Sequence, residues 1–160
     1  MIDRLTSEAY ALILIIATGG LLFGAQIMEH QFDMDPCPLC LMQRIWFFFS
    51  GLIAYVGLLH NPRWGIYPLL TIFTACVGGA FAIRQLWLQS LPADQVPACG
   101  PSLEYMIDAL PFTEVLKAMT SGTGDCAEVV WSFGLTLPGW ALVGFVAIAG
   151  VAVLQWRAKG

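Results

Sequence analysis

The chain has 160 residues, of which 58% are hydrophobic and 11% are charged, and its net charge is -4. The hydrophobic share exceeds that of an ordinary soluble domain, which favours a protein embedded in lipid. The acidic balance argues against a nucleic-acid partner.

Four apolar segments follow one another along the chain, each largely free of Asp, Glu, Lys and Arg. Each can hold roughly the 20 residues that cross about 30 Å of hydrocarbon. We therefore expect an all-α fold in which residues 1–160 form one four-helix membrane bundle. The expected spans are residues 9–28, 40–59, 66–88 and 138–156.

Basic residues set the expected orientation. Arg4 precedes the first span, Arg63 lies between the second and third spans, and Arg157 and Lys159 follow the fourth. Because such residues collect on the cytoplasmic side, both termini are expected in the cytoplasm. A short loop and a long loop, residues 29–39 and 89–137, then face outward.

The long outer loop carries a helical pattern. Apolar residues recur near helical spacing from Leu103 to Met119. This pattern predicts a broken amphipathic helix on the membrane surface, and a helix that simply covers the bundle is equally compatible with it.

Four of the five cysteines fall in or beside the outer loops. Cys37 and Cys40 form a C-x-x-C at the start of the second span, and Cys99 and Cys126 lie in the long loop. These four can form disulfides outside the cytoplasm, and although three pairings are possible, proximity favours Cys37 with Cys40. Cys76, inside the third span, is expected to pack as a small hydrophobic residue without a function.

The C-x-x-C has the features of a redox-active pair. A disulfide between Cys37 and Cys40 would close too small a loop to act as a staple, whereas stapling is a reasonable role for Cys99 and Cys126. Zinc is a weak alternative because the second pair is not a tight knuckle, so we expect no metal. A helix N-terminus lowers the pKa of a thiol, which favours reactivity at the C-x-x-C.

A redox-active dithiol in a membrane needs an electron acceptor. The sequence has no haem or flavin motif, so a lipid-soluble quinone is the expected one. Arg44 lies one turn after Cys40 and could hold a carbonyl-bearing ligand, although a lone interfacial arginine ordinarily reaches toward lipid headgroups. The other candidate quinone contacts are His30, Arg84, Gln85 and Trp87, for which solvation and an aromatic belt are the ordinary alternatives.

The chain resembles the DsbB family of bacterial inner-membrane proteins. The resemblance covers nearly the whole chain and rests on four spans, "PCPLC" followed by Arg44, Cys99 early in the large loop, "GDCAE", and "PGW" at the fourth span. It implies an enzyme that reoxidises a periplasmic thioredoxin-fold, DsbA-like thiol oxidase. Electrons would pass to the membrane quinone pool, either ubiquinone or menaquinone, from redox loops that face the periplasm.

The resemblance also implies a relay of electrons between the cysteines. The partner would attack a Cys99/Cys126 disulfide through Cys99, and the freed Cys126 would exchange with Cys37. Cys40, beside Arg44, would then deliver the electrons to the quinone.

Two alternatives stay open. A quinone reductase like vitamin K epoxide reductase combines the same elements, but with its C-x-x-C near a late span. A non-enzymatic four-span scaffold with structural disulfides would keep its disulfides inert.

Overall fold

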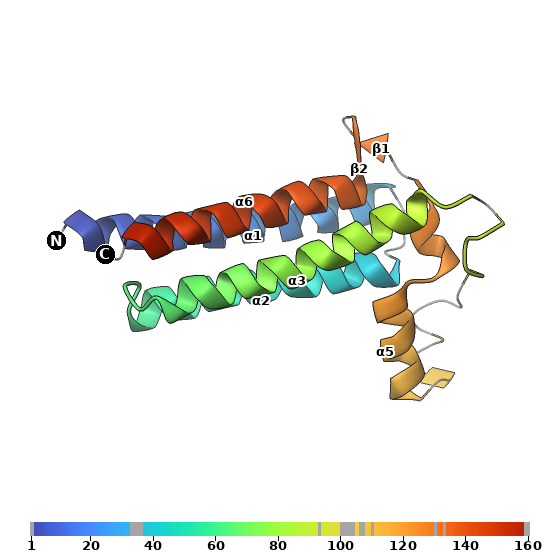
Figure 1. Ribbon diagram of the computed structural model, residues 1–160, viewed down its shortest axis with the longest axis horizontal. Helices are drawn as coiled ribbons and strands as arrows, with labels where there is room; N and C mark the ends of the chain where they lie inside the picture. The colour runs from blue at the N-terminus through green and yellow to red at the C-terminus, as the bar shows by residue number, and fades with distance from the viewer. Residues whose placement is uncertain are drawn as a thin grey trace.

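Four long helices lie side by side in the computed structural model (Figure 1). Each is long and apolar enough to cross a membrane, which confirms the predicted all-α, four-span fold. They are α1 (Ile2–Phe32), α2 (Pro38–His60), α3 (Ile66–Gln89) and α6 (Leu137–Ala158). The structure describes residues 2–32, 37–92, 94–99, 105, 108–109, 111–129, 131–132 and 134–158.

Local sequence sets the ends of these helices. Pro38 occupies the first turn of α2, where its missing N–H costs nothing and its fixed φ suits a helix. Helix α2 therefore starts two residues before the Cys40 that the sequence suggested. It ends before Asn61, and a short turn leads into α3 at the same end of the bundle as both termini (Figure 1).

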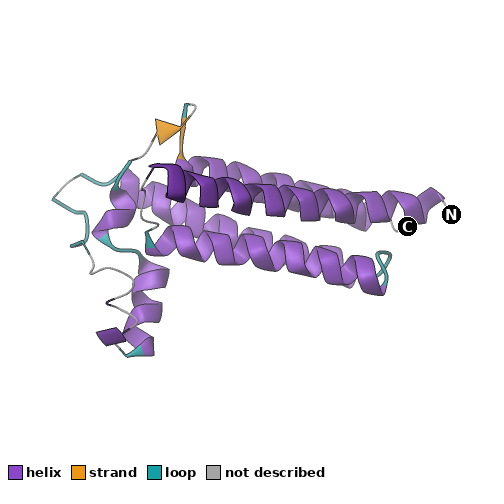
Figure 2. Ribbon diagram, turned by 180° about the vertical axis from the view of Figure 1, so that it is seen from behind, coloured by secondary structure: helices purple, strands orange, loops and turns teal. Residues whose placement is uncertain are grey.

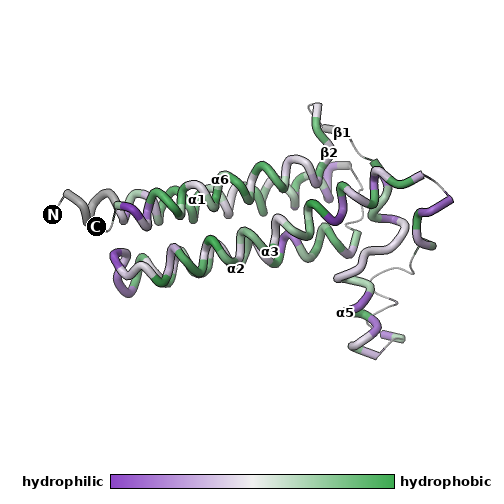
Figure 3. The backbone as a smooth tube through the Cα atoms, viewed as in Figure 1, coloured by the Kyte–Doolittle hydropathy of each residue, from purple (hydrophilic) through white to green (hydrophobic). Residues whose placement is uncertain are grey.

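Small residues let the helices approach closely, and large apolar side chains cover the outside. The rings of Phe47 and Phe145 stack at 3.8 Å between α2 and α6. A Cβ at Gly78 would lie 2.2 Å from the Phe145 ring, so glycine is required where α3 meets α6. Ile16 is 72% exposed, as expected of a lipid-facing position. Apolar residues run along all four helices, and polar residues gather toward their ends (Figure 3).

The long loop between α3 and α6 folds at the end opposite the termini (Figure 2). Helix α5 (Phe112–Ser121) packs against α2, and the 3-10 helix η1 (Gly124–Ala127) packs against α3. Strands β1 (Trp131–Ser132) and β2 (Leu135–Thr136) form a small antiparallel hairpin, which the sequence analysis did not predict.

Helix α5 accounts for the second half of the expected amphipathic segment. It runs across the direction of the bundle (Figure 1), with Val115 buried and Phe112 78% exposed. Much of the first half of that segment, including residues 103 and 104, lies outside the described residues. Attachment of α5 to a membrane surface stays a prediction.

Candidate active site

The C-x-x-C is held by the N-terminus of α2. Cys37 is the N-cap residue, and its sulfur accepts a hydrogen bond from the backbone N–H of Cys40 at 3.4 Å. The sulfur atoms of Cys37 and Cys40 lie 2.7 Å apart, and both thiols are free and half-buried. The helix start therefore places two thiols side by side, where a small movement converts them to a disulfide.

Gln85 of α3 lies against both thiols. Its side-chain Nε2 is 3.3 Å from the sulfur of Cys37 and 3.3 Å from the sulfur of Cys40. Gln43 of α2 donates a hydrogen bond to Gln85 Oε1 at 2.7 Å, and the two glutamines are 5% and 3% exposed. Gln85 was predicted to line a quinone site, and in the structure it contacts both sulfurs.

Gln43 was missed from the sequence. The available signal was a polar amide three residues after Cys40, in a helix otherwise long and apolar enough to span the membrane. Polar groups at such positions are costly and need a partner.

Cys126 joins the C-x-x-C from the outer loop. It is 0% exposed and packs in η1 against Leu39 and Leu88. The Cys37 thiol hydrogen-bonds the Cys126 sulfur, which raises the pKa of Cys37 and lowers the pKa of Cys126 to about 6. The sequence predicted a lowered thiol pKa at the C-x-x-C, whereas the pKa of Cys37 is raised, because its thiol hydrogen-bonds the sulfurs of Cys126 and Cys40.

Two glycines bring η1 to this position. Gly122 follows α5 with φ of 80°, and a Cβ there would lie 2.7 Å from Leu39 Cδ1. Gly124 donates its backbone N–H to the carbonyl oxygen of Ala98 at 3.1 Å. A Cβ at Gly124 would lie 2.3 Å from the carbonyl oxygen of Pro97. Only glycine allows the irregular segment before Cys99 to lie against η1.

Cys99 stays at the surface. It is exposed, and a hydrogen bond with Asp125 raises the pKa of its thiol because the carboxylate disfavours a second negative charge. The structure thus brings Cys37, Cys40 and Cys126 together and leaves Cys99 accessible.

Cys76 does not pack inside the bundle as expected. Its side chain is exposed on the outside of α3, where a thiol is compatible with lipid. Position within an apolar span therefore did not specify which face of the helix Cys76 occupies.

Arg44 links α2 to α1. Its Nη1 donates to Glu29 Oε2 at 2.5 Å, and its Nη2 donates to the carbonyl oxygen of Ala25 at 3.4 Å. Both charged side chains are about three-quarters buried, with 24% and 26% of their surface exposed. The sequence analysis did not identify Glu29 as the partner of Arg44. His30 is exposed, with Nε2 3.2 Å from Gln26 Nε2.

Arg84 and Trp87 lie on the exposed face of α3. The Arg84 guanidinium stacks over the Trp87 ring at 4.4 Å and donates to the carbonyl oxygen of Ser121 at 3.4 Å. These contacts tie α3 to the end of α5. Contact of Arg84, Trp87 or His30 with a quinone stays a prediction.

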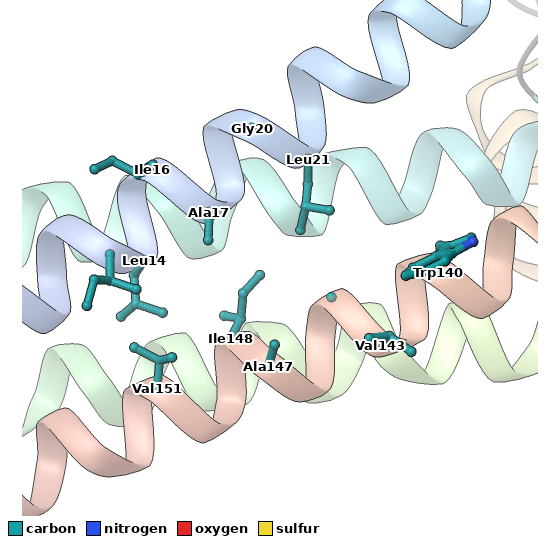
Figure 4. A pocket seen from close by; sticks show the side chains of 12 residues that line it. Leu14, Ile16, Ala17, Gly20, Leu21, Trp140, Val143, Ala147, Ile148 and Val151 are labelled. Atoms are coloured by element: carbon teal, nitrogen blue, oxygen red, sulfur yellow. The ribbon is translucent and has the colours of Figure 1, made fainter. Parts of the chain in front are cut away.

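An apolar groove of about 430 Å³ lies between α1 and α6. Figure 4 shows Ala17 and Leu21 of α1 facing Trp140 and Ile148 of α6 across it. One helical turn separates Leu21 from Ala25, whose carbonyl oxygen accepts from Arg44. Among the described residues, no group of three or more His, Cys, Asp or Glu side chains could hold a metal ion.

Comparison with known proteins gives a consistent result. The family model described as "Disulfide bond formation protein DsbB" matches residues 7–155. Disulfide bond formation protein B of Hahella chejuensis is 49% identical over 156 residues, which cover 95% of this chain and 94% of that protein. The protein of the same name from Marinobacter nauticus is 52% identical over 151 residues, covering 91% and 90% of the two chains. Disulfide bond formation protein B 1 of Pseudomonas aeruginosa is 44% identical over 149 residues, covering 91% of each chain. No solved structure matches the chain.

Proposed function

This chain belongs to the DsbB family and is a multi-pass membrane protein of disulfide bond formation, and we propose its function on that basis. In this proposal it reoxidises a periplasmic thioredoxin-fold, DsbA-like thiol oxidase and passes the electrons to membrane quinone. It would lie in the bacterial inner membrane with cytoplasmic termini. The observation that carries the proposal is the meeting of Cys37, Cys40 and Cys126 at the loop end of the bundle.

The first step is entry of electrons at Cys99. The partner's thiolate attacks the Cys99 sulfur of a Cys99–Cys126 disulfide, a mixed disulfide forms, and Cys126 leaves with the electron pair. Two features support this direction. Cys99 is exposed, and the backbone N–H groups of Leu39 and Thr123, which hydrogen-bond the Cys126 sulfur, would stabilise its thiolate as the leaving group.

The second step is exchange at the C-x-x-C. The Cys126 thiolate attacks the Cys37 sulfur, the Cys37–Cys40 bond breaks, and the electron pair moves to the Cys40 sulfur. In the reduced protein the Cys126 sulfur lies within hydrogen-bonding reach of the Cys37 sulfur, which supports this order because the attacking sulfur is then beside Cys37. The partner's second thiol then attacks the mixed disulfide, which oxidises the partner and releases the Cys99 thiolate. Cys99 attacks Cys126, the Cys126–Cys37 bond breaks, and the Cys37 thiolate is released beside Cys40.

A bound quinone would accept two electrons and two protons as Cys37 and Cys40 reform their disulfide. Arg44 would hold its polar ring through a guanidinium donor, with Glu29 fixing the guanidinium in place. The groove between α1 and α6 would take the apolar chain of the quinone. The groove is lined by apolar side chains, and on α1 it begins one helical turn from Ala25, which Arg44 contacts. The assay with each quinone in turn distinguishes ubiquinone from menaquinone as the acceptor.

The test uses the purified protein with a reduced thioredoxin-fold oxidase and each quinone in turn. We expect quinone absorbance to fall with partner oxidation in the wild-type protein and to stay constant in Cys40→Ala. Oxidation of the partner without loss of quinone, or loss of quinone in Cys40→Ala, contradicts the proposal. Labelling of Cys99 in whole cells with an impermeant maleimide tests the periplasmic orientation separately.

A further inference from the structure

Two glutamines inside apolar helices meet at the reactive thiols. Gln43 and Gln85 are both almost fully buried in segments that cross the membrane. A carboxamide at such a position is costly unless each of its polar atoms has a partner. The two side chains have four N–H donors and two acceptor oxygens, and the hydrogen bond between them uses only one of each. The partners of the remaining N–H groups therefore decide whether the buried pair is stable.

The geometry fixes which end of the Gln85 amide faces the sulfurs. Gln43 Nε2 donates to Gln85 Oε1 at 2.7 Å, which turns Gln85 Nε2 toward the C-x-x-C. The same oxygen also accepts a longer hydrogen bond, 3.6 Å, from the Cys40 thiol, which is lost when that thiol ionises. That nitrogen carries two hydrogens and lies 3.3 Å from each of the two sulfurs. A single side chain therefore offers a donor to both members of the dithiol.

A hydrogen-bond donor at this position binds a negatively charged sulfur more strongly than a neutral one. Hydrogen bonds to ionised groups are roughly twice as strong as those between neutral groups. Opening of the Cys37–Cys40 disulfide by the Cys126 thiolate puts the leaving electron pair on the Cys40 sulfur, in contact with Gln85 Nε2. The nearby cation contributes less there, because Arg44 is engaged with Glu29 and with the carbonyl of Ala25.

We infer that Gln85 is a catalytic residue that stabilises the thiolate formed when the Cys37–Cys40 disulfide opens, and that Gln43 is its positioning residue. This inference rests on the proposed relay and deepens it by naming the group that receives the leaving sulfur. The donor favours the reduced, charged pair over the neutral disulfide. Its loss therefore makes the Cys37–Cys40 disulfide harder to open.

The test measures the disulfide without partner or quinone. A protein with Cys76, Cys99 and Cys126 replaced by Ala is equilibrated with glutathione buffers, and the reduced fraction is read by alkylation and mass spectrometry. For Gln85→Met, which keeps the length and removes the donor, we expect the equilibrium constant for reduction to fall about tenfold, equivalent to about 30 mV. The fall should grow as the pH is raised, because only the thiolate gains the full hydrogen bond.

Control variants separate this role from packing. Gln43→Met should give a smaller fall, since Gln85 keeps its donor but loses its orientation. Gln89→Met, one turn further along α3, should match the parent, because Gln89 Nε2 binds the carbonyl oxygen of Glu128 instead of a sulfur. Gln85→Leu supplies a second donor-free side chain if the Met variant does not fold.

The inference is overturned if the equilibrium constant for reduction in Gln85→Met and Gln85→Leu lies within about twofold of the parent value. It is also overturned if that constant falls by the same factor at every pH. A wild-type protein that fails to reduce quinone with any thioredoxin-fold donor overturns the proposed function instead. The glutathione equilibrium is independent of that result.

Discussion

Replacing Gly124 with Ala tests how the outer loop is held against the thiol cluster. The added Cβ would lie 2.3 Å from the carbonyl oxygen of Pro97, 2.9 Å from the backbone nitrogen of Cys99 and 3.1 Å from the carbonyl carbon of Ala98. All three are backbone atoms, so no side-chain rotation relieves the clash. The segment Pro97–Cys99 must move away by roughly 1 Å to reach ordinary contact, which disrupts the hydrogen bond from Gly124 N–H to the carbonyl oxygen of Ala98.

Loss of that hydrogen bond costs about 1 kcal/mol, and residual strain adds to it. We therefore expect the equilibrium constant for forming a Cys99–Cys126 disulfide to fall about tenfold, since 1.4 kcal/mol corresponds to a factor of about ten. The assay is equilibration with glutathione in a protein whose Cys37, Cys40 and Cys76 are replaced by Ser.

Gly150→Ala is the matched control, because nothing lies within 4 Å of a Cβ at Gly150. The equilibrium constant for forming the Cys99–Cys126 disulfide in Gly150→Ala should equal that of the parent. A Gly124→Ala protein that forms the disulfide as readily as Gly150→Ala would refute the reasoning, because the loop would then close without the close approach of its two backbones.

Three further outcomes are expected. Cys99→Ala should abolish the mixed disulfide with a reduced thioredoxin-fold oxidase, and equal trapping of that complex would remove Cys99 as the entry point. Arg44→His should raise the quinone KM roughly tenfold through loss of a charge-assisted hydrogen bond, and unchanged steady-state kinetics would exclude Arg44 from the site. In the reduced protein, the ultraviolet absorbance of the Cys126 thiolate, which needs no access to the buried sulfur, should rise as the pH passes through about 6. Cys37→Ala should move that rise toward the ordinary thiol value of 9.0, and a profile that does not move would exclude the hydrogen bond as its cause.

The helices were predictable from the sequence because their signal is local. A run of uncharged residues long enough to cross a bilayer has few other stable structures, so each span could be located before the fold was known. The C-x-x-C was equally visible, since Pro38 and the apolar run after Cys40 mark a helix start. The β1–β2 hairpin was missed because its strands are only two residues long, too short to show an alternation of apolar and polar residues. The single glycine at its turn, Gly134 with φ of 85°, does not by itself predict a hairpin.

The site could be predicted only in part because its contacts join distant segments. Cys126 meets Cys37 through packing of η1 on α2 and α3, which no local pattern encodes. Gln85 was named for its place near the end of a span, but its direction depends on Gln43 of another helix. Likewise, Arg44 was found from its spacing, whereas its partner Glu29 lies on α1.

The length of α2 has a consequence for the lipid around it. Its 23 residues span roughly 35 Å at about 1.5 Å per residue, slightly more than an average hydrocarbon layer. Because Cys37 and Cys40 are fixed to the N-terminal end of α2, bilayer thickness sets how deep the sulfurs lie. A thinner bilayer, by tilting the helix, would shift the dithiol relative to the headgroup plane. Lipid composition is thus expected to tune turnover with no change in the protein.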